Sequence, residues 1–185
     1  MALITLIEII NLIIVSVVIG YIFLGYVSLR PKTVYDMMNP RKFDWNNLKF
    51  ATLVAAPGVV LHELAHKFVA MGYGANATFQ IFPLGLALGV VLKLINSPFL
   101  IIAPGGVFIG GLLGNDFAYR VTALAGPLVN LLLFVVAYLM LNYRKNLSRF
   151  EHSFWFLTKQ INLILFIFNM LPFGPLDGAK VLFGS

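Results

Sequence analysis

The feature that most restricts the fold of this 185-residue chain is a series of long apolar runs that carry very few charges. The hydrocarbon core of a bilayer is about 30 Å thick, and a helix needs about 20 apolar residues to cross it. Runs that approach or exceed this length lie at residues 3–29, 50–71, 119–141 and 154–171. We therefore predict an all-α polytopic membrane protein with about four transmembrane helices.

Polar residues are too few to cover a globule in water. Hydrophobic residues make up 60% of the chain and charged residues 11%, whereas soluble domains have about 45–50% apolar and about 25% charged residues. The net charge is +6, but the basic residues mostly lie between the apolar runs, as they do in loops of membrane proteins. We expect a lipid bilayer and not nucleic acid as the partner, and a multi-pass protein of the cell membrane.

The apolar stretch at residues 75–113 is interrupted too often to be read as an ordinary helix. Its helix-breaking residues are Pro83, Gly85, Gly89, Pro98, Pro104, Gly105, Gly106, Gly110 and Gly111. Irregular backbone at membrane depth is tolerated where it packs on protein or lines a wet cavity. We predict a membrane-associated hairpin or re-entrant segment here, with a fifth span as the alternative. The whole chain, 1–185, is expected to form one transmembrane domain.

The second apolar run contains the pentapeptide His62-Glu63-Leu64-Ala65-His66. On a helix the two histidines share one face and can bind one Zn²⁺, with the glutamate placed to accept a proton from the attacking water. The chain has only three histidines and no cysteine, and ionisable residues inside a membrane are functional by default. We therefore predict one zinc ion per chain. The alternative is a pair of core histidines with a glutamate partner.

Catalytic zinc usually has three protein ligands, so a third is needed. Beyond His66 the candidates are Asp116, Glu151, His152 and Asp177. Glu151 and His152 lie in a charged loop, and Asp116 follows a Gly-Asn pair that is typical of a turn.

Chain direction favours Asp177 as the third ligand. The spans alternate in direction, so the run at 50–71 and the run at 154–171 are parallel. The histidines lie toward the C-terminal end of the first of these, and Asp177 lies just beyond the end of the second. A role for Asp177 as the N-cap of a short helix at 178–180 is the competing interpretation and does not exclude metal binding.

These residues together resemble the site-2 protease family of intramembrane metalloproteases. The resemblance rests on the His62–His66 motif and on residues 169–178, which read Asn-x-x-Pro-x-x-Pro-Leu-Asp-Gly. Residues 125–130, Ala-Gly-Pro-Leu-Val-Asn, are similar to a third element of that family, A-G-P-x-x-N. Two features differ: Ala179 stands where a second glycine is usual, and no PDZ or CBS module accompanies the motifs.

The resemblance implies His62, His66 and Asp177 as zinc ligands and Glu63 as the general base. It also implies that Asn169 lies near the substrate carbonyl and helps to hold the oxyanion. The expected substrate is a membrane protein cut within or near a transmembrane helix, with the segment Thr78 to Val90 pairing with it by strand addition. Positive-inside counting places the zinc toward the outer face, whereas the resemblance, which we follow, implies the cytoplasmic side.

Three other functions remain open at this point. A membrane zinc protease of the CAAX-processing type would need a downstream glutamate as its third ligand, and Glu151 is the available one. A metal transporter could use the same ligands for transit, although such proteins favour internal repeats. An inactive membrane scaffold is the third.

Overall fold

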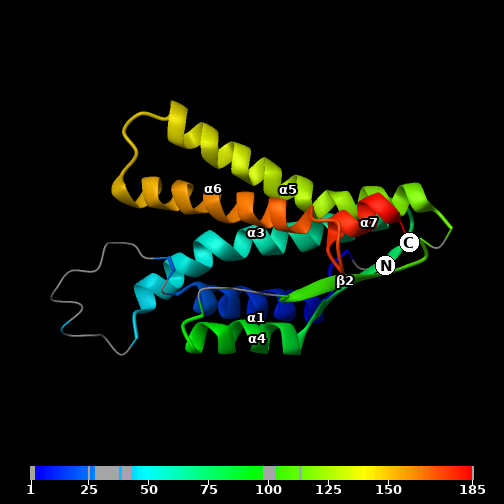
Figure 1. The fold of residues 1–185 in the computed structure, drawn as a ribbon, viewed down its shortest axis with the longest axis horizontal. Coiled ribbons are helices and arrows are strands. Elements are labelled where there is room, and N and C mark those ends of the chain that lie inside the picture. The colour runs from blue at the N-terminus through cyan, green and yellow to red at the C-terminus, as the bar shows by residue number, and fades with distance from the viewer. Residues whose placement is uncertain are drawn as a thin grey trace.

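A computed structural model describes residues 3–24, 26–27, 38, 43–97, 103–112 and 114–184. The elements follow one another along the chain as helix α1 (Leu6–Phe23), helix α3 (Trp45–Gly72), strand β1 (Asn76–Ile81), helix α4 (Pro83–Leu94), strand β2 (Gly105–Gly110), helix α5 (Asp116–Tyr143), helix α6 (Arg149–Asn169) and helix α7 (Asp177–Phe183) (Figure 1). The fold is thus a helical polytopic membrane protein with one small sheet, as predicted.

Within the described ranges, the helices long and apolar enough to cross a membrane are α1, α3 and α5. They correspond to the first three predicted spans. Helix α1 ends at Phe23, before the predicted limit at residue 29; residues 25 and 28–29 lie outside the described part of the chain. Helix α6 covers the fourth predicted span as far as Asn169. It is not among the helices apolar enough to cross a membrane, and it carries polar residues such as Lys159, Gln160 and Asn162.

Helix α1 and helix α6 begin at the same kind of sequence signal. The hydroxyl of Thr5 accepts the backbone N–H of Glu8 at 3.3 Å, and the carboxylate of Glu8 accepts the backbone N–H of Thr5 at 2.8 Å. Ser148 and Glu151 form the corresponding reciprocal pair. These capping boxes satisfy N–H groups that a helix start leaves without partners.

The segment at 75–113 is a strand–helix–strand unit. Strands β1 and β2 pair antiparallel, in a register that runs from Asn76↔Gly110 to Ile81↔Gly105. Helix α4 lies between them in sequence, so the segment Thr78–Val90, expected to pair with a substrate strand, is a strand only as far as Ile81 and is helical from Pro83. With 12 residues, α4 is also too short to be the alternative fifth span. Residues 98–102 and 113 lie outside the described part.

Helix α4 forms in this segment because its proline and glycines lie at positions where a helix tolerates them. Pro83 opens α4, and proline at the first turn costs no hydrogen bond. Gly85 allows close packing, because a Cβ there would lie 2.1 Å from the carbonyl oxygen of Ala103. Pro83 thus sets the start of a short helix and Gly85 allows it to pack closely, and neither residue prevents the helix from forming.

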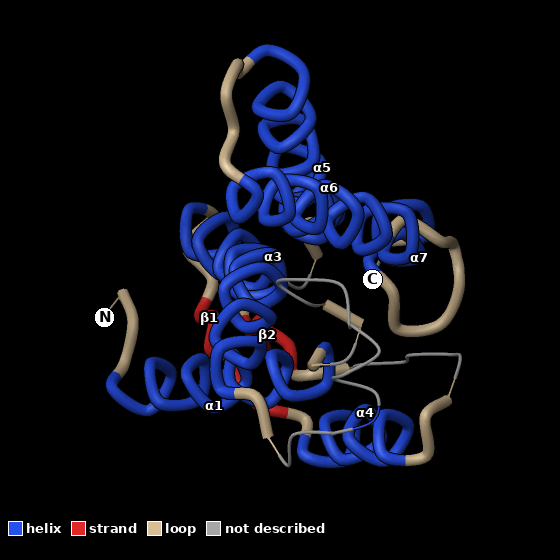
Figure 2. Tube along the Cα trace, turned by 90° about the vertical axis from the view of Figure 1, so that its left-hand side faces the viewer, coloured by secondary structure: helices blue, strands red, loops and turns tan. Residues whose placement is uncertain are grey.

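Helix α3 lies at the centre of the molecule. Helices α5, α6 and α7 lie on one side of it, and α1, α4 and the sheet lie on the other (Figure 2). Side chains of α1, α3 and β1, including Ile19, Val54 and Phe79, form the main buried cluster between them. The outward face of α1 exposes apolar side chains such as Leu6 and Ile13, as expected of a helix that faces lipid.

Candidate metal centre

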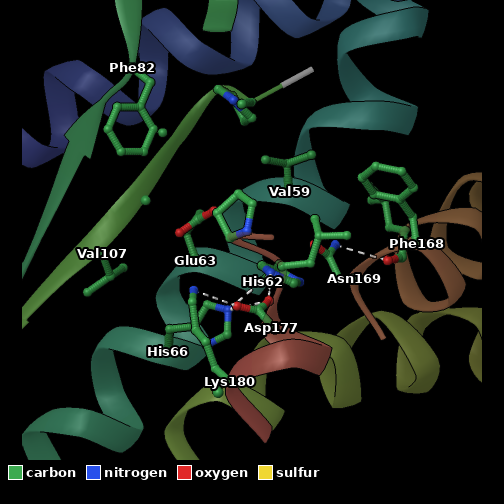
Figure 3. A pocket seen from close by; sticks show the side chains of 18 of the residues that line it. Val59, His62, Glu63, His66, Phe82, Val107, Phe168, Asn169, Asp177 and Lys180 are labelled. Atoms are coloured by element: carbon green, nitrogen blue, oxygen red, sulfur yellow. Dashed lines mark hydrogen bonds and ion pairs between the residues drawn. The ribbon is translucent and has the colours of Figure 1, made fainter. Parts of the chain in front are cut away.

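His62, His66 and Asp177 come together at one point. The Nε2 atoms of the two histidines are 3.0 Å apart, and each lies 3.1 Å from Oδ2 of Asp177 (Figure 3). All three side chains are buried. Within the described part of the chain, they form the single group of three or more His, Asp or Glu side chains whose ligand atoms converge closely enough to hold a metal ion. The structure thus brings together the three residues proposed as ligands.

Two local features place these ligands. His62 and His66 are one turn apart on α3, so their rings lie on the same face. Asp177 is the first residue of α7, and its neighbour Gly178 packs tightly against the end of α6. A Cβ at Gly178 would lie 2.3 Å from the carbonyl oxygen of Met170. The glycine therefore lets α7 approach close enough for the carboxylate to reach the histidines.

The N-cap interpretation of Asp177 is wrong. The N-cap of α7 is Leu176, and no side chain caps the helix. The carboxylate of Asp177 instead contacts the histidines through Oδ2 and the ammonium of Lys180 through Oδ1, at 3.1 Å. Its negative charge also lies at the first turn of a helix, where it is favoured.

Each histidine has a second partner that fixes its orientation. Nδ1 of His66 donates to the carbonyl oxygen of Thr122 at 2.7 Å, and Nδ1 of His62 donates to Oδ1 of Asn130 at 2.6 Å. Nδ2 of Asn130 itself donates to the carbonyl oxygen of Gly58 and to Oδ1 of Asn162, both at 3.0 Å. The proton therefore sits on Nδ1 of each ring, and the lone pair of Nε2 faces the centre, as metal binding requires.

The space in front of the rings is kept free by Gly126 on α5. A Cβ there would lie 2.4 Å from Nε2 of His66 and 2.7 Å from Nε2 of His62. Two imidazoles and one carboxylate are the ligand set of several catalytic zinc sites, with Zn–N distances of about 2.0–2.1 Å. The donor set, its burial and the free volume all fit zinc, which confirms the predicted cofactor.

A cavity of about 570 Å³ opens beside the ligands. Glu63 lies on its wall, next to the ligand group and outside it, as Figure 3 shows. Residues 105–109 of β2 line a second wall. Apolar side chains of α1 and α6 complete it, among them Ile19, Phe23, Ile164 and Phe168. The proposed ligands and Glu63 therefore face a partly open cavity with largely apolar walls.

Asn169 also lines this cavity, at the end of α6. Its Nδ2 donates to the carbonyl oxygen of Leu165 at 2.9 Å. The amide nitrogen carries two hydrogens, so one engaged hydrogen leaves the other available to a bound group.

The competing ligand candidates lie elsewhere. Glu151 is in the first turn of α6, where it completes the capping box and lies 3.4 Å from Arg144. His152 stacks on Phe156 in the same turn region. The ligand group meets the opposite end of α6, about 30 Å away by the rise of a 21-residue helix. A site that uses Glu151, as the CAAX-processing alternative requires, does not fit this arrangement.

The sequence did not reveal the roles of Asn130, Asn162 and Thr122. Asn130 ends the A-G-P-x-x-N element at residues 125–130. An asparagine inside an apolar span is itself an indication of a buried polar partner. Thr122 acts through its backbone carbonyl, which no side-chain pattern can indicate. The partnership of Lys180 with Asp177 follows helical spacing, since the two are three residues apart.

Comparison with known proteins gives three relatives. The chain is 42% identical over 132 residues to "Putative zinc metalloprotease MJ0611" of Methanocaldococcus jannaschii, covering 70% of this chain and 67% of that protein. It is 29% identical over 146 residues to "Putative zinc metalloprotease YwhC" of Bacillus subtilis, covering 66% and 62%. It is 27% identical over 124 residues to "Zinc metalloprotease MJ0392" of M. jannaschii, covering 67% and 30%. No family model and no solved structure matches.

Proposed function

The chain belongs to the zinc metalloprotease family of these relatives, and from that premise we propose that it is an intramembrane endopeptidase of the site-2 type. It hydrolyses peptide bonds within or near transmembrane helices of membrane-protein substrates, as in regulated intramembrane proteolysis. The observation that carries the proposal is the position of the metal centre: His62, Glu63 and His66 lie on α3, a helix long and apolar enough to span the membrane, and face a cavity with apolar walls.

The residues of the site divide the chemistry between them. His62 and His66 would hold zinc through Nε2, and Asp177 would hold it through Oδ2. When bound, zinc supplies Lewis-acid polarisation of a carbonyl and of water. Glu63, outside the ligand group, accepts a proton from the attacking water and returns it to the leaving amine. Asn169 offers an N–H to the oxygen of the scissile carbonyl.

The strand β2 is the natural support for an extended substrate. A transmembrane helix must unwind locally before one of its amides can react, since its backbone groups are otherwise hydrogen-bonded to each other. An unwound segment can regain hydrogen bonds by adding as a strand to a sheet edge. Strand β1 covers one edge of β2, and β2 itself lines the cavity beside Glu63. Strand addition therefore fits β2, in place of the segment Thr78–Val90.

The proposed surroundings are a lipid bilayer, with the chain as a multi-pass protein of the cell membrane. The exposed apolar faces of the long helices support this placement. The zinc lies toward the cytoplasmic side in this proposal, which agrees with the site-2 resemblance.

Replacement of the base tests the reaction. The purified protein in liposomes, with a transmembrane test substrate, is compared with Glu63→Gln and with Glu151→Gln, a partly exposed glutamate changed in the same way. We expect Glu63→Gln to keep one zinc per chain and to cut about 10²–10⁴-fold more slowly, whereas Glu151→Gln behaves as the wild type. Normal cleavage by Glu63→Gln would refute the mechanism. Cleavage confined to water-soluble peptides would refute the intramembrane assignment.

A further inference from the structure

A buried ion pair lies outside the metal centre and has no part in the proposed reaction. Glu8 of α1 and Lys67 of α3 are only 1% and 2% exposed, and the ammonium of Lys67 donates to Oε1 of Glu8. Neither side chain lines the cavity. Both belong to helices apolar enough to span a membrane, where charged side chains are costly and mark a function.

The carboxylate of Glu8 joins three segments. Oε1 accepts the ammonium of Lys67 and, at 2.9 Å, the backbone N–H of Phe79 in β1. Oε2 accepts the N–H and the hydroxyl of Thr5 at 2.8 and 3.0 Å. One side chain thus ties the start of α1, the end of α3 and the middle of β1 to each other.

The bond to Phe79 defines which edge of the sheet is free. Phe79 is opposite Val107 in the register. Because the N–H of Phe79 points to Glu8, it points away from β2, so this is a non-hydrogen-bonded pair of the antiparallel ladder. The N–H and C=O of Val107 then point away from β1, on the edge of β2 that lines the cavity. Glu8 thus accepts an N–H on the outer edge of the sheet, and within the described part of the chain no strand pairs with the inner edge.

The same pair links the sheet to the zinc ligands. Lys67 directly follows His66 on α3, so Glu8 holds β1 next to a ligand-bearing turn. Strand β2 follows β1 closely, since a Cβ at Gly105 would lie 2.8 Å from the ring of Phe79. The position of the free edge relative to the metal centre therefore depends on Glu8.

We propose that Glu8 is a positioning residue that, through its acceptor for the Phe79 N–H, sets the register of β2 against the zinc ligands and thereby selects which substrate peptide bond is cut. This inference rests on strand addition at β2, as proposed above. A substrate strand that slips by one residue turns its other face to the site, whereas a slip by two keeps the same face. Loss of the acceptor for the Phe79 N–H should therefore spread cleavage to bonds two residues away.

The test compares two double variants in liposomes. Glu8→Leu with Lys67→Met removes both charges and the acceptor of the Phe79 N–H. Glu8→Gln with Lys67→Met removes both charges and keeps that acceptor. Cleavage products are identified by mass spectrometry, zinc content is measured, and hydrogen exchange is followed at residues 76–81. The surface pair Arg144 and Glu151, exposed and partly exposed, is changed to glutamine together and controls for charge removal.

We expect the Leu/Met variant to bind one zinc per chain, to cut at additional bonds two residues from the wild-type site, and to exchange faster at residues 76–81. The Gln/Met variant and the surface-pair control should cut at the wild-type bond alone. A Leu/Met variant that binds zinc and still cuts that one bond overturns the proposal. A Gln/Met variant that cuts at the same additional bonds as the Leu/Met variant also overturns the proposal.

If the Leu/Met variant does not retain zinc, Glu8→Asp carries the test. It keeps the charge but retracts the carboxylate by one methylene, so it cannot reach Lys67 and Phe79 together. Additional cleavage sites in Glu8→Asp support the proposal, and the wild-type pattern overturns it. Failure of the proposed function is distinguished by the wild type itself, which would then bind zinc and cut no membrane substrate.

Discussion

Helix α3 has a buried polar cluster on each side, and the two clusters differ in charge. Toward α5 and α6, His62 contacts Asn130, which contacts Asn162, and this network is built on neutral amides. Toward α1 and β1, Lys67 contacts Glu8, and this cluster is a full ion pair. Both are almost fully buried.

The difference follows from what each cluster must do. A partner of a metal ligand has to orient the imidazole ring, and the oxygen of a neutral amide does this with a single hydrogen bond. A cluster that holds segments together gains from a carboxylate, which can accept several donors at once. Glu8 accepts four. The neutral cluster thus serves the chemistry, and the charged one serves the geometry.

The largest effect is expected at the metal centre itself. Asp177→Ala removes the single carboxylate among the proposed ligands, so zinc affinity should fall by more than the about 10–100-fold typical of outer partners. Competition with a chelator of known affinity measures this. Retention of wild-type affinity would show that Asp177 is not a ligand and would move the third position to another carboxylate.

The next effect concerns the charged cluster. Lys67→Met leaves Glu8 as a lone buried charge, which should lower the free energy of unfolding by about 3–5 kcal/mol, whereas the Glu8→Leu/Lys67→Met double variant should lose much less. Denaturation in detergent micelles measures both. If the single variant is as stable as the double one, Glu8 and Lys67 are not coupled.

A smaller effect is expected for the neutral cluster. Asn130→Ala removes the acceptor of the His62 N–H, and zinc affinity should fall by about 10–100-fold with little change in stability. Asn142→Ala, on the same helix α5 but exposed and bonded to the carbonyl of Tyr138, is the matched control. An unchanged zinc affinity in Asn130→Ala would show that the neutral cluster does not support zinc binding.

How much of this could be predicted depended on how local each feature is. His62, Glu63 and His66 follow from helical spacing alone, and Asp177 follows from the alternation of the spans. The partner of His62 does not, because Asn130 and Asn162 meet it only through the packing of three helices. Helix α4 could not be predicted because glycines and prolines lie within and around it. A strand rich in glycine, such as β2, shows little alternation of apolar and polar residues. The Glu8–Lys67 pair joins residues 59 positions apart, beyond any periodicity.

Gly126 shows that the centre also depends on an absent side chain. A single methyl group there would clash with the Nε2 atoms of both imidazole rings. Gly126→Ala therefore keeps all three proposed ligand residues but forces at least one imidazole ring to move. The space for a metal ion and the identity of its ligands thus depend on different positions of the sequence. A change in side-chain volume at Gly126 can prevent metal binding although no ligand residue is replaced.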